Sequence, residues 1–254
     1  MAEMLLLTGA GFRQAVMPNN RDNGREAMRG EAYYRTRLSG ERLRSCYELA
    51  PQRVQQYLDA EISFVLGRVE AAESVLELGC GYGRVLVRLA QRTRRAVGID
   101  TSLDSLELAR ELTAGNGSCE LTVMDATALG FRHRAFDMAV CIQNGICAFR
   151  VNPRKLLQEA LRVTRPGGSV LFSSYTDAFW PHRLAWFELQ ADQGLVGQID
   201  YAATTRGEIV CKDGFRFGSF GVDEFTQLCD EVSVQPTIVE VDDSSVFCEI
   251  TIPR

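Results

Sequence analysis

The chain has 254 residues, of which 46% are hydrophobic and 24% are charged, and its formal net charge is −5. This length and composition suit one large α/β domain with a sizeable buried core. The negative net charge disfavours a protein that binds long nucleic acid, because such a protein needs a basic face to neutralise the phosphates.

The cysteine spacing and the hydropathy of the chain narrow the class of protein further. The eight cysteines are widely separated, no C-x-x-C pair occurs and the chain has two histidines, so the sequence predicts no metal site. No apolar stretch approaches the roughly 20 residues that a membrane helix needs, and the first residues lack a secretory signal pattern. We therefore expect a cytoplasmic monomer or homodimer, without membrane association, in which most cysteines are small core residues.

The chain changes character near residue 30. Residues 1–30 are largely polar and lack apolar periodicity, and we expect them to be poorly ordered. Residues 31–72 form a predicted helical region, because apolar residues recur at spacings of three and four from Val54 to Val69. The main domain is expected to span residues 73–254.

From residue 74 onward, short apolar segments alternate with amphipathic ones. The apolar segments are predicted strands at residues 74–78, 96–100, 119–124, 136–142 and 170–174. Helices are predicted between them, at residues 84–92, 102–112 and 153–163. Strands that are apolar almost throughout and alternate with helices indicate a doubly wound, mostly parallel sheet with helices on both faces.

The C-terminal part departs from this alternation. A predicted helix at residues 222–232 is followed by two strands at 237–241 and 246–252, which we expect to form an antiparallel hairpin that closes the sheet. Residues 177–221, after the fifth strand, form an insertion that the sheet does not require. This insertion is predicted to contain an aromatic-rich helix and a hairpin across residues 204–220.

A glycine-rich turn follows the first predicted strand. Gly79, Gly81 and Gly83 let a ligand approach the backbone, and the start of the next helix would present backbone N–H groups. Asp100 ends the second strand, where a carboxylate can accept both hydroxyls of a ribose. Asp125 stands in the corresponding place after the third strand, within reach of an adenine amino group. Because the carboxyl ends of parallel strands share one edge, these features predict a nucleoside site.

The residues after the turn bear on the kind of nucleotide. A dinucleotide fingerprint requires a small residue five positions after Gly79, and Arg84 stands there. No Gly-Lys-Ser/Thr follows the turn, so a P-loop is not predicted either. A nicotinamide-dependent oxidoreductase is therefore a disfavoured alternative.

The ordered motifs resemble those of the class I S-adenosylmethionine-dependent methyltransferases. The matching segments are residues 75–83, 98–100, 124–126 and 161–168. The resemblance implies a seven-stranded, mostly parallel sheet with a reversed last strand, and a substrate lid in the insertion after the fifth strand. It also implies methyl transfer from S-adenosylmethionine by direct displacement, in which alignment of the two reactants supplies much of the rate.

The same resemblance implies roles for residues at the carboxyl edge. Glu77 and the glycine turn would surround the methionine part of the cofactor, and Asp100 would hold its ribose. Asp125 and the Ala126 backbone would meet the adenine, and residues 143–146 would face the substrate. The expected cofactor-binding residues are Glu77, Gly79, Cys80, Gly81, Gly83, Asp100, Thr101, Asp125, Ala126, Gln143, Asn144 and Ile146.

A small molecule is the expected methyl acceptor. Methyltransferases of nucleic-acid bases resemble one another in an Asn/Asp-Pro-Pro-Tyr/Phe turn after the fourth strand or use a Pro-Cys nucleophile, and this chain has neither. Trp186 and Phe187 of the insertion either line a pocket for a partly apolar acceptor or pack within the insertion. His182 is the first candidate for a general base, with Tyr175 and Asp177 as alternatives.

Three further interpretations stay open. Tyr33 and Tyr34 either cover the cofactor or pack on the surface. A thiophilic substrate, of the kind that arsenite methyltransferases take, would require Cys46, Cys147 and Cys211 to converge. A chain that kept the cofactor pocket without turnover would be a non-catalytic binding protein.

Overall fold

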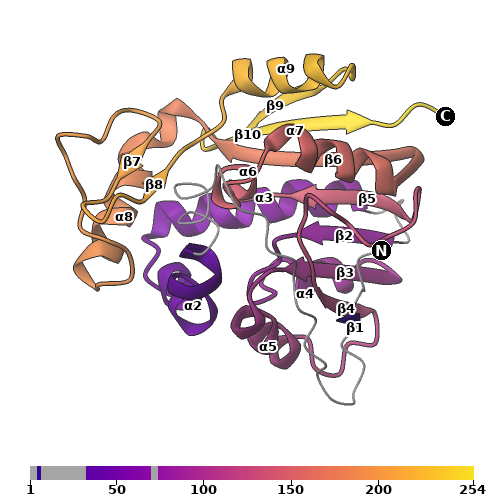
Figure 1. The fold of residues 1–254 in the computed structure, drawn as a ribbon, viewed down its shortest axis with the longest axis horizontal. Coiled ribbons are helices and arrows are strands. Elements are labelled where there is room, and N and C mark those ends of the chain that lie inside the picture. The colour runs from indigo at the N-terminus through magenta and orange to yellow at the C-terminus, as the bar shows by residue number, and fades with distance from the viewer. Residues whose placement is uncertain (1–4, 7–32, 70–73) are drawn as a thin grey trace, which may run out of the picture.

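A computed structural model describes residues 5–6, 33–69 and 74–254. The predicted disorder of residues 1–30 therefore lies outside the described residues, apart from Leu5 and Leu6. The described elements form three layers, with a sheet between two groups of helices (Figure 1).

The described residues form one eight-stranded sheet. Its strands, in chain order, are β1 (Leu5–Leu6), β2 (Ser74–Leu78), β3 (Arg95–Asp100), β4 (Cys119–Val123), β5 (Phe136–Cys141), β6 (Thr164–Tyr175), β9 (Thr237–Val241) and β10 (Ser245–Thr251). They lie in the order β1-β4-β3-β2-β5-β6-β10-β9. Strands β2 to β6 are parallel, whereas β10 is antiparallel to both β6 and β9. The predicted seven-stranded sheet with a reversed last strand is confirmed, and β1 adds a short antiparallel strand beside β4.

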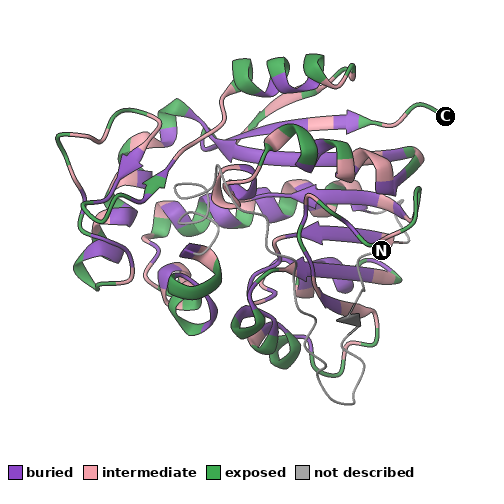
Figure 2. Ribbon diagram, viewed as in Figure 1, coloured by how far each residue is buried: buried purple, intermediate pink, exposed green. Residues whose placement is uncertain are grey.

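Helices cover both faces of the sheet because successive residues of each strand point to opposite sides. Met138 and Val140 of β5 pack in one apolar cluster, and Ala139 and Cys141 pack in the other. Strands β2, β3, β5, β6 and β10 are accordingly buried along most of their length (Figure 2). The helices on the first face are α3 (Gln52–Val69), α4 (Leu86–Ala90) and α5 (Leu103–Leu112), and those on the second face are α6 (Gly145–Ala148), α7 (Pro153–Val163) and α9 (Val222–Glu231).

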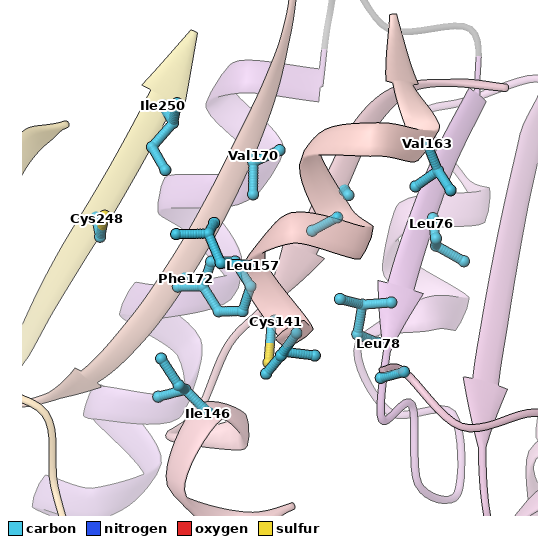
Figure 3. Packing of buried hydrophobic residues seen from close by; sticks show 14 of the residues in the cluster. Leu76, Leu78, Cys141, Ile146, Leu157, Val163, Val170, Phe172, Cys248 and Ile250 are labelled. Atoms are coloured by element: carbon cyan, nitrogen blue, oxygen red, sulfur yellow. The ribbon is translucent and has the colours of Figure 1, made fainter. Parts of the chain in front are cut away.

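On the second face, the spacing of apolar residues along a helix determines which side chains pack against the sheet. Apolar residues of α7 recur at spacings of three and four and face the sheet, which puts Leu157 and Val163 in the same cluster as Leu76 and Phe172 (Figure 3). Asn152 caps the N-terminus of α7, since its side-chain oxygen accepts a hydrogen bond from the Lys155 N–H at 3.1 Å.

The insertion and the N-terminal helical region pack against each other beyond the sheet. The N-terminal region contains the π-helical turn η1 (Tyr33–Arg37) and α2 (Gly40–Glu48), while the insertion contains η2 (Asp177–Phe179), α8 (Trp180–Asp192), β7 (Ile209–Val210) and β8 (Arg216–Phe217). Tyr33 stacks on Phe215 with ring centroids 3.7 Å apart, and the Trp186 indole N–H donates to the Cys46 carbonyl at 2.8 Å. In Figure 1 these elements gather at one end of the molecule, at the left of the view.

Two predicted boundaries were wrong. The helix predicted at residues 84–92 is the five-residue α4, because Gly83 has a φ of +87° and the chain leaves it through turns. The strand predicted at 170–174 is the longer β6, since Thr164 already pairs with Phe136 and the Gly167 N–H donates to the Ile252 carbonyl at 2.8 Å. The Pro-Gly-Gly segment thus lies within β6 at an irregularity in its pairing with β5.

A buried carboxyl group joins α3 to the ends of β5 and β6. Glu61 is fully buried, and its Oε2 accepts hydrogen bonds from the Gln143 N–H at 2.7 Å and the Ser173 hydroxyl at 2.9 Å. Burial raises the pKa of Glu61 to about 7, although these two hydrogen bonds lower it.

In the described part of the chain, none of the helices has the combination of length and apolar composition needed to span a bilayer.

Replacing Phe172 by Ala tests the core of the second face. Its side chain is 1% exposed, so we expect Phe172→Ala to lower the free energy of unfolding by about 3–5 kcal/mol through lost burial and a cavity. Urea unfolding measures the change. Leu112→Ala is the control, because Leu112 is 48% exposed and its truncation should change stability by less than about 0.5 kcal/mol. Equal effects of the two substitutions would contradict this packing.

Replacing Glu61 by Gln tests the buried carboxyl group. Its pKa is about 7 in the folded protein against 4.5 for an ordinary glutamate, so the folded state binds more protons between these values. The free energy of unfolding should therefore fall as the pH rises from 4.5 to 7. We expect this fall to be about 1–3 kcal/mol smaller in Glu61→Gln, measured by urea unfolding at pH 5 and 7.5. The exposed Glu107→Gln is the control, and a wild-type pH dependence in Glu61→Gln would disprove the raised pKa.

Candidate functional site

The carboxyl ends of β2, β3, β4 and β5 lie at one edge of the sheet because these strands are parallel. Residues at these ends line a cavity of about 240 Å³. The opposite wall comes from the N-terminal helical region, through Tyr34, Leu38, Leu43 and Tyr47. The cavity therefore lies between the sheet edge and a segment that precedes the sheet in sequence.

Most of the predicted cofactor residues line this cavity, namely Glu77, Gly79, Cys80, Gly81, Asp100, Thr101, Asp125, Ala126 and Gln143. Three others lie elsewhere. Gly83 packs against α5, where a Cβ at Gly83 would lie 3.0 Å from the Cβ of Ala109. Asn144 lines a neighbouring, smaller cavity. Ile146 is 3% exposed and points into the core of the second face, so the structure does not bring it to the cavity (Figure 3).

The glycine turn bends sharply along the cavity wall. Gly79 has a φ of +72°, and a Cβ there would lie 2.3 Å from the Phe149 ring, so only glycine fits. The backbone amides of Gly79 and Cys80 both donate to the Ile99 carbonyl at 2.9 Å, and the Gly81 amide donates to Asp100 Oδ2 at 2.9 Å. The turn therefore uses these three amides internally.

Asp100 and Asp125 lie in the predicted places after β3 and β4, in different environments. The Asp100 carboxylate is half-buried and accepts a second backbone hydrogen bond from Ser102 at 2.8 Å. Burial raises the pKa of Asp100, and its backbone hydrogen bonds lower it. Asp125 is exposed, and its Oδ1 accepts from the amide and the hydroxyl of Thr127 at 2.7 and 2.8 Å. Both carboxylates keep lone pairs that a ligand in the cavity can use.

Glu77 and Arg84 bring two unpaired polar groups to the same cavity. Glu77 is 4% exposed, and neither its Oε2 nor the Nη2 of Arg84 has a hydrogen-bond partner among the described residues. The Arg84 guanidinium lies over the Tyr47 ring, 4.8 Å from its centroid. Burial raises the pKa of Glu77 to about 8, the Arg84 charge lowers it and Asp100 raises it. Such unpartnered buried groups are costly, and a zwitterionic ligand would satisfy both.

A second cavity of about 70 Å³ adjoins the first. The two cavities share wall residues, namely Tyr34, Leu38, Leu43, Tyr47, Gln143 and Ala148. The remaining walls of the second cavity are Cys46, Asn144, Tyr175, Trp186, Phe187, Gln190 and Phe217. Trp186 and Phe187 thus line a pocket and also pack within the insertion, so both interpretations of these residues apply.

Gln143 occupies the boundary between the two cavities. Gln143 and Asn144 have φ angles of +57° and +62°, which are strained for residues other than glycine. The bonds of the Gln143 N–H to Glu61 and Ser173 hold this conformation. The Gln143 side-chain Nε2 is buried and has no partner among the described residues. The Asn144 side chain instead ties the sheet edge to the insertion, accepting from Ser174 at 2.7 Å and donating to the Gly218 carbonyl at 3.0 Å.

The three candidates for a general base lie in one stretch of the chain but differ in their access to the cavities. His182 is exposed on α8, with its ring 5.6 Å from that of Phe179, and it lines neither cavity. Asp177 is also exposed and lines neither cavity. Tyr175 is 8% exposed and lines the second cavity, and burial raises its pKa to about 12. The structure therefore brings Tyr175, and not His182, to the candidate site.

Sequence reasoning missed several cavity residues. Tyr47 lies on α2 and lines both cavities, and no motif in the sequence singles it out. Arg84 follows the glycine turn directly, and the sequence pattern gives it no role beyond its conflict with a dinucleotide fingerprint. Tyr34 lines both cavities, whereas Tyr33 packs against the insertion.

The cysteines do not gather at the site. Cys46 lines the second cavity, while Cys211 packs in the core of the insertion. Within the described ranges, no group of three or more His, Cys, Asp or Glu side chains is placed to hold a metal ion.

Comparison with known proteins agrees with this geometry. Residues 75–168 match the family model of a methyltransferase domain. The chain is 38% identical over 106 residues to a demethylmenaquinone methyltransferase of Clavibacter sepedonicus, which covers 42% of each protein. It is 32% identical over 146 residues to a malonyl-[acyl-carrier protein] O-methyltransferase of Salmonella typhimurium, covering 57% of this chain and 55% of that protein. The chain thus spans about half the length of these curated relatives.

A solved structure shares the fold over nearly the whole chain. The PH0226 protein from Pyrococcus horikoshii superimposes with a TM-score of 0.61 at 21% identity, covering 88% of this chain and 99% of that one. The family match falls on the strands and turns that line the first cavity. Residues 75–168 are therefore similar to a methyltransferase domain, as the resemblance to the class I S-adenosylmethionine-dependent methyltransferases implies.

Proposed function

We propose that the chain binds S-adenosylmethionine in the first cavity and transfers its methyl group to a small, largely apolar acceptor in the second. The observation that carries this proposal is that the two cavities share walls, with Gln143 at their boundary. A cofactor and an acceptor in these cavities would meet beside Gln143. When bound, S-adenosylmethionine supplies a methyl group that its sulfonium makes strongly electrophilic.

The unpaired groups of the first cavity support an orientation for the cofactor. The Glu77 carboxylate would pair with its ammonium group, and the Arg84 guanidinium with its carboxylate. Asp100 would accept the ribose hydroxyls, and Asp125 with the Ala126 backbone would meet the adenine. This arrangement directs the sulfur end of the ligand toward Gln143 and the second cavity.

The walls of the second cavity support an acceptor with a largely apolar surface. Among the described residues that line it, none is a carboxylate, histidine, lysine or arginine. Four of the walls that it does not share with the first cavity are aromatic, namely Tyr175, Trp186, Phe187 and Phe217. Tyr175 stays protonated near neutral pH because its pKa is about 12. Catalysis would then rest on alignment of the acceptor with the methyl group, which supplies several kcal/mol of barrier reduction (about 7–11 in ideal cases).

The names of the relatives support methyl transfer more strongly than any one acceptor. One relative is named for demethylmenaquinone and another for malonyl-[acyl-carrier protein]. These acceptors differ in chemistry, whereas the methyltransferase domain is common to both. The cytoplasmic location, the monomeric or dimeric state and the absence of a nucleic-acid substrate remain predictions from the sequence.

Asp100→Ala tests the position of the cofactor. Loss of the bonds between its carboxylate and the ribose should weaken binding of S-adenosylhomocysteine by about 1.5–3 kcal/mol, measured by isothermal titration calorimetry. Asp59→Ala, at an exposed position of α3, is the control and should bind as the wild type does. Unchanged affinity in Asp100→Ala would refute the placement, and binding of NADH instead of S-adenosylhomocysteine would favour an oxidoreductase. Formation of S-adenosylhomocysteine with an acceptor separates an enzyme from a non-catalytic binding protein.

Arg84→Met tests the orientation of the bound cofactor. Adenosine lacks the amino-acid part of S-adenosylhomocysteine, so the two ligands report on different ends of the site. We expect Arg84→Met to weaken S-adenosylhomocysteine by about 1.5–3 kcal/mol and to leave adenosine affinity unchanged. Asp100→Ala should weaken both ligands. Equal losses of both ligands in Arg84→Met would show that Arg84 does not face the amino-acid end.

A further inference from the structure

Arg183 is a buried cation that lies behind the second cavity. It belongs to α8 and is 1% exposed. Its Nη2 donates to the carbonyl oxygens of Phe217 at 2.5 Å and Gly218 at 2.7 Å, and its Nη1 donates to that of Gly207 at 3.1 Å. Its Nε has no partner, and no carboxylate forms an ion pair with it, among the described residues. The positive charge is therefore held by carbonyl dipoles without a counter-ion in that part of the chain.

The same guanidinium lies against the wall of the second cavity. Its carbon lies 4.5 Å from the ring centroid of Tyr175 and 5.8 Å from that of Phe187. Tyr175, Phe187 and Phe217 all line the cavity, while Arg183 itself does not. One layer of aromatic side chains thus separates the charge from the cavity.

The titratable groups that face Arg183 do not neutralise it. They are Tyr175 of β6, Cys147 of α6, Tyr57 of α3 and Tyr34 of η1. Burial raises the pKa values of Tyr175 and Cys147 to about 12 and those of Tyr57 and Tyr34 well above their usual range. All four are therefore uncharged near neutral pH.

The carboxyl groups nearest to these facing residues have other partners or a raised pKa. Glu61, on the α3 side of Tyr175, has a pKa of about 7 and accepts from the Gln143 amide and Ser173. Glu224, which acts on Cys147, accepts from the Gly221 amide at 2.9 Å. Arg53, over the Phe179 ring at 5.1 Å, is paired with Asp242. Among the described residues on this side of the cavity, Arg183 is thus a fully buried cation without a carboxylate partner.

A charge without a counter-ion acts strongly on a nearby cavity. Burial of an unpaired ion is costly, and the low local dielectric lets its field reach groups several ångströms away. An anion in the second cavity would be stabilised, and a cation would be repelled. A phenolate suits this cavity because it spreads its charge over a ring that the aromatic walls can contact.

We propose that the acceptor binds in the second cavity as the phenolate of a hydroxylated aromatic ring, with Arg183 as a positioning residue that supplies the opposing charge across Tyr175. This inference rests on the proposed function. The phenolic proton leaves to solvent when the acceptor binds. The phenolate oxygen then forms a bond to the methyl carbon as the sulfur–methyl bond breaks, and that electron pair returns to sulfur. Positive sulfonium and negative phenolate become a neutral thioether and a neutral methyl ether.

4-Nitrophenol tests this inference, because its phenolate has a distinct visible absorption and it ionises near neutral pH. Its dissociation constant is measured by absorbance titration across pH 5.5–8.5 with S-adenosylhomocysteine present. We expect the wild type to bind the phenolate at least about tenfold more tightly than the neutral phenol. Arg183→Met should abolish the preference, whereas Arg183→Lys, which keeps a cation, should retain part of it.

Arg150→Met is the matched control, since Arg150 also lies over an aromatic ring of the insertion, 5.3 Å from Phe215, and donates to the Arg216 carbonyl. It should keep the wild-type preference. Equal wild-type affinity for phenol and phenolate, no binding at any pH, or a preference that survives Arg183→Met would each overturn the inference. Loss in both Arg183 variants would assign the arginine a structural role and would also overturn it.

Two measurements keep these outcomes interpretable. If Arg183→Met does not fold, the pH dependence of the wild type still decides, because equal affinity for the two protonation states excludes a phenolate site. Calorimetry with S-adenosylhomocysteine alone tests the proposed function separately. Failure of that binding overturns methyl transfer, whereas binding without a phenolate preference overturns only the inference about Arg183.

Discussion

Five parallel strands buried on both faces impose the constraint on which the rest of this structure depends. Strands β2, β3, β5 and β6 present apolar residues to both helical layers, so an unpaired polar group in their interior is costly. Polar side chains are admitted where the strands end, at the carboxyl edge. Glu77, Asp100 and Gln143 gather there from strands that are adjacent in the sheet but separated in sequence. The order of the strands thus creates the cavity.

The second cavity depends on two segments outside the sheet. The N-terminal helical region and the insertion share apolar clusters that include Tyr33 with Phe215 and Tyr57 with Phe179. Their packing closes the space beyond the strand ends and lines it with aromatic side chains. A methyltransferase domain that lacked this insertion would leave Gln143 facing a more open surface, because Tyr175 and the sheet alone supply few of these walls.

Several polar side chains at these cavities have a buried atom without a hydrogen-bond partner in the described structure. Glu77 and Arg84 face the first cavity, and Arg183 lies behind the second. Each such group lowers stability compared with an apolar residue of the same shape, so the fold does not need them for packing. Their placement instead matches charges that ligands would bring, which is why stability and ligand recognition oppose each other at this edge.

The sequence by itself determined the elements of the sheet, the glycine turn and the positions of Asp100 and Asp125, because apolar periodicity and strand-end polarity are local properties. It also indicated the reversed last strand, through the resemblance to the methyltransferases. Only the tertiary structure decided which side chains reach a cavity. Helix position on α8 turns His182 to solvent and buries Arg183, the next residue, although both are basic side chains in one stretch of sequence. The short α6 sends Ile146 into the core, because the direction of a side chain depends on the packing of its element against elements distant in the chain.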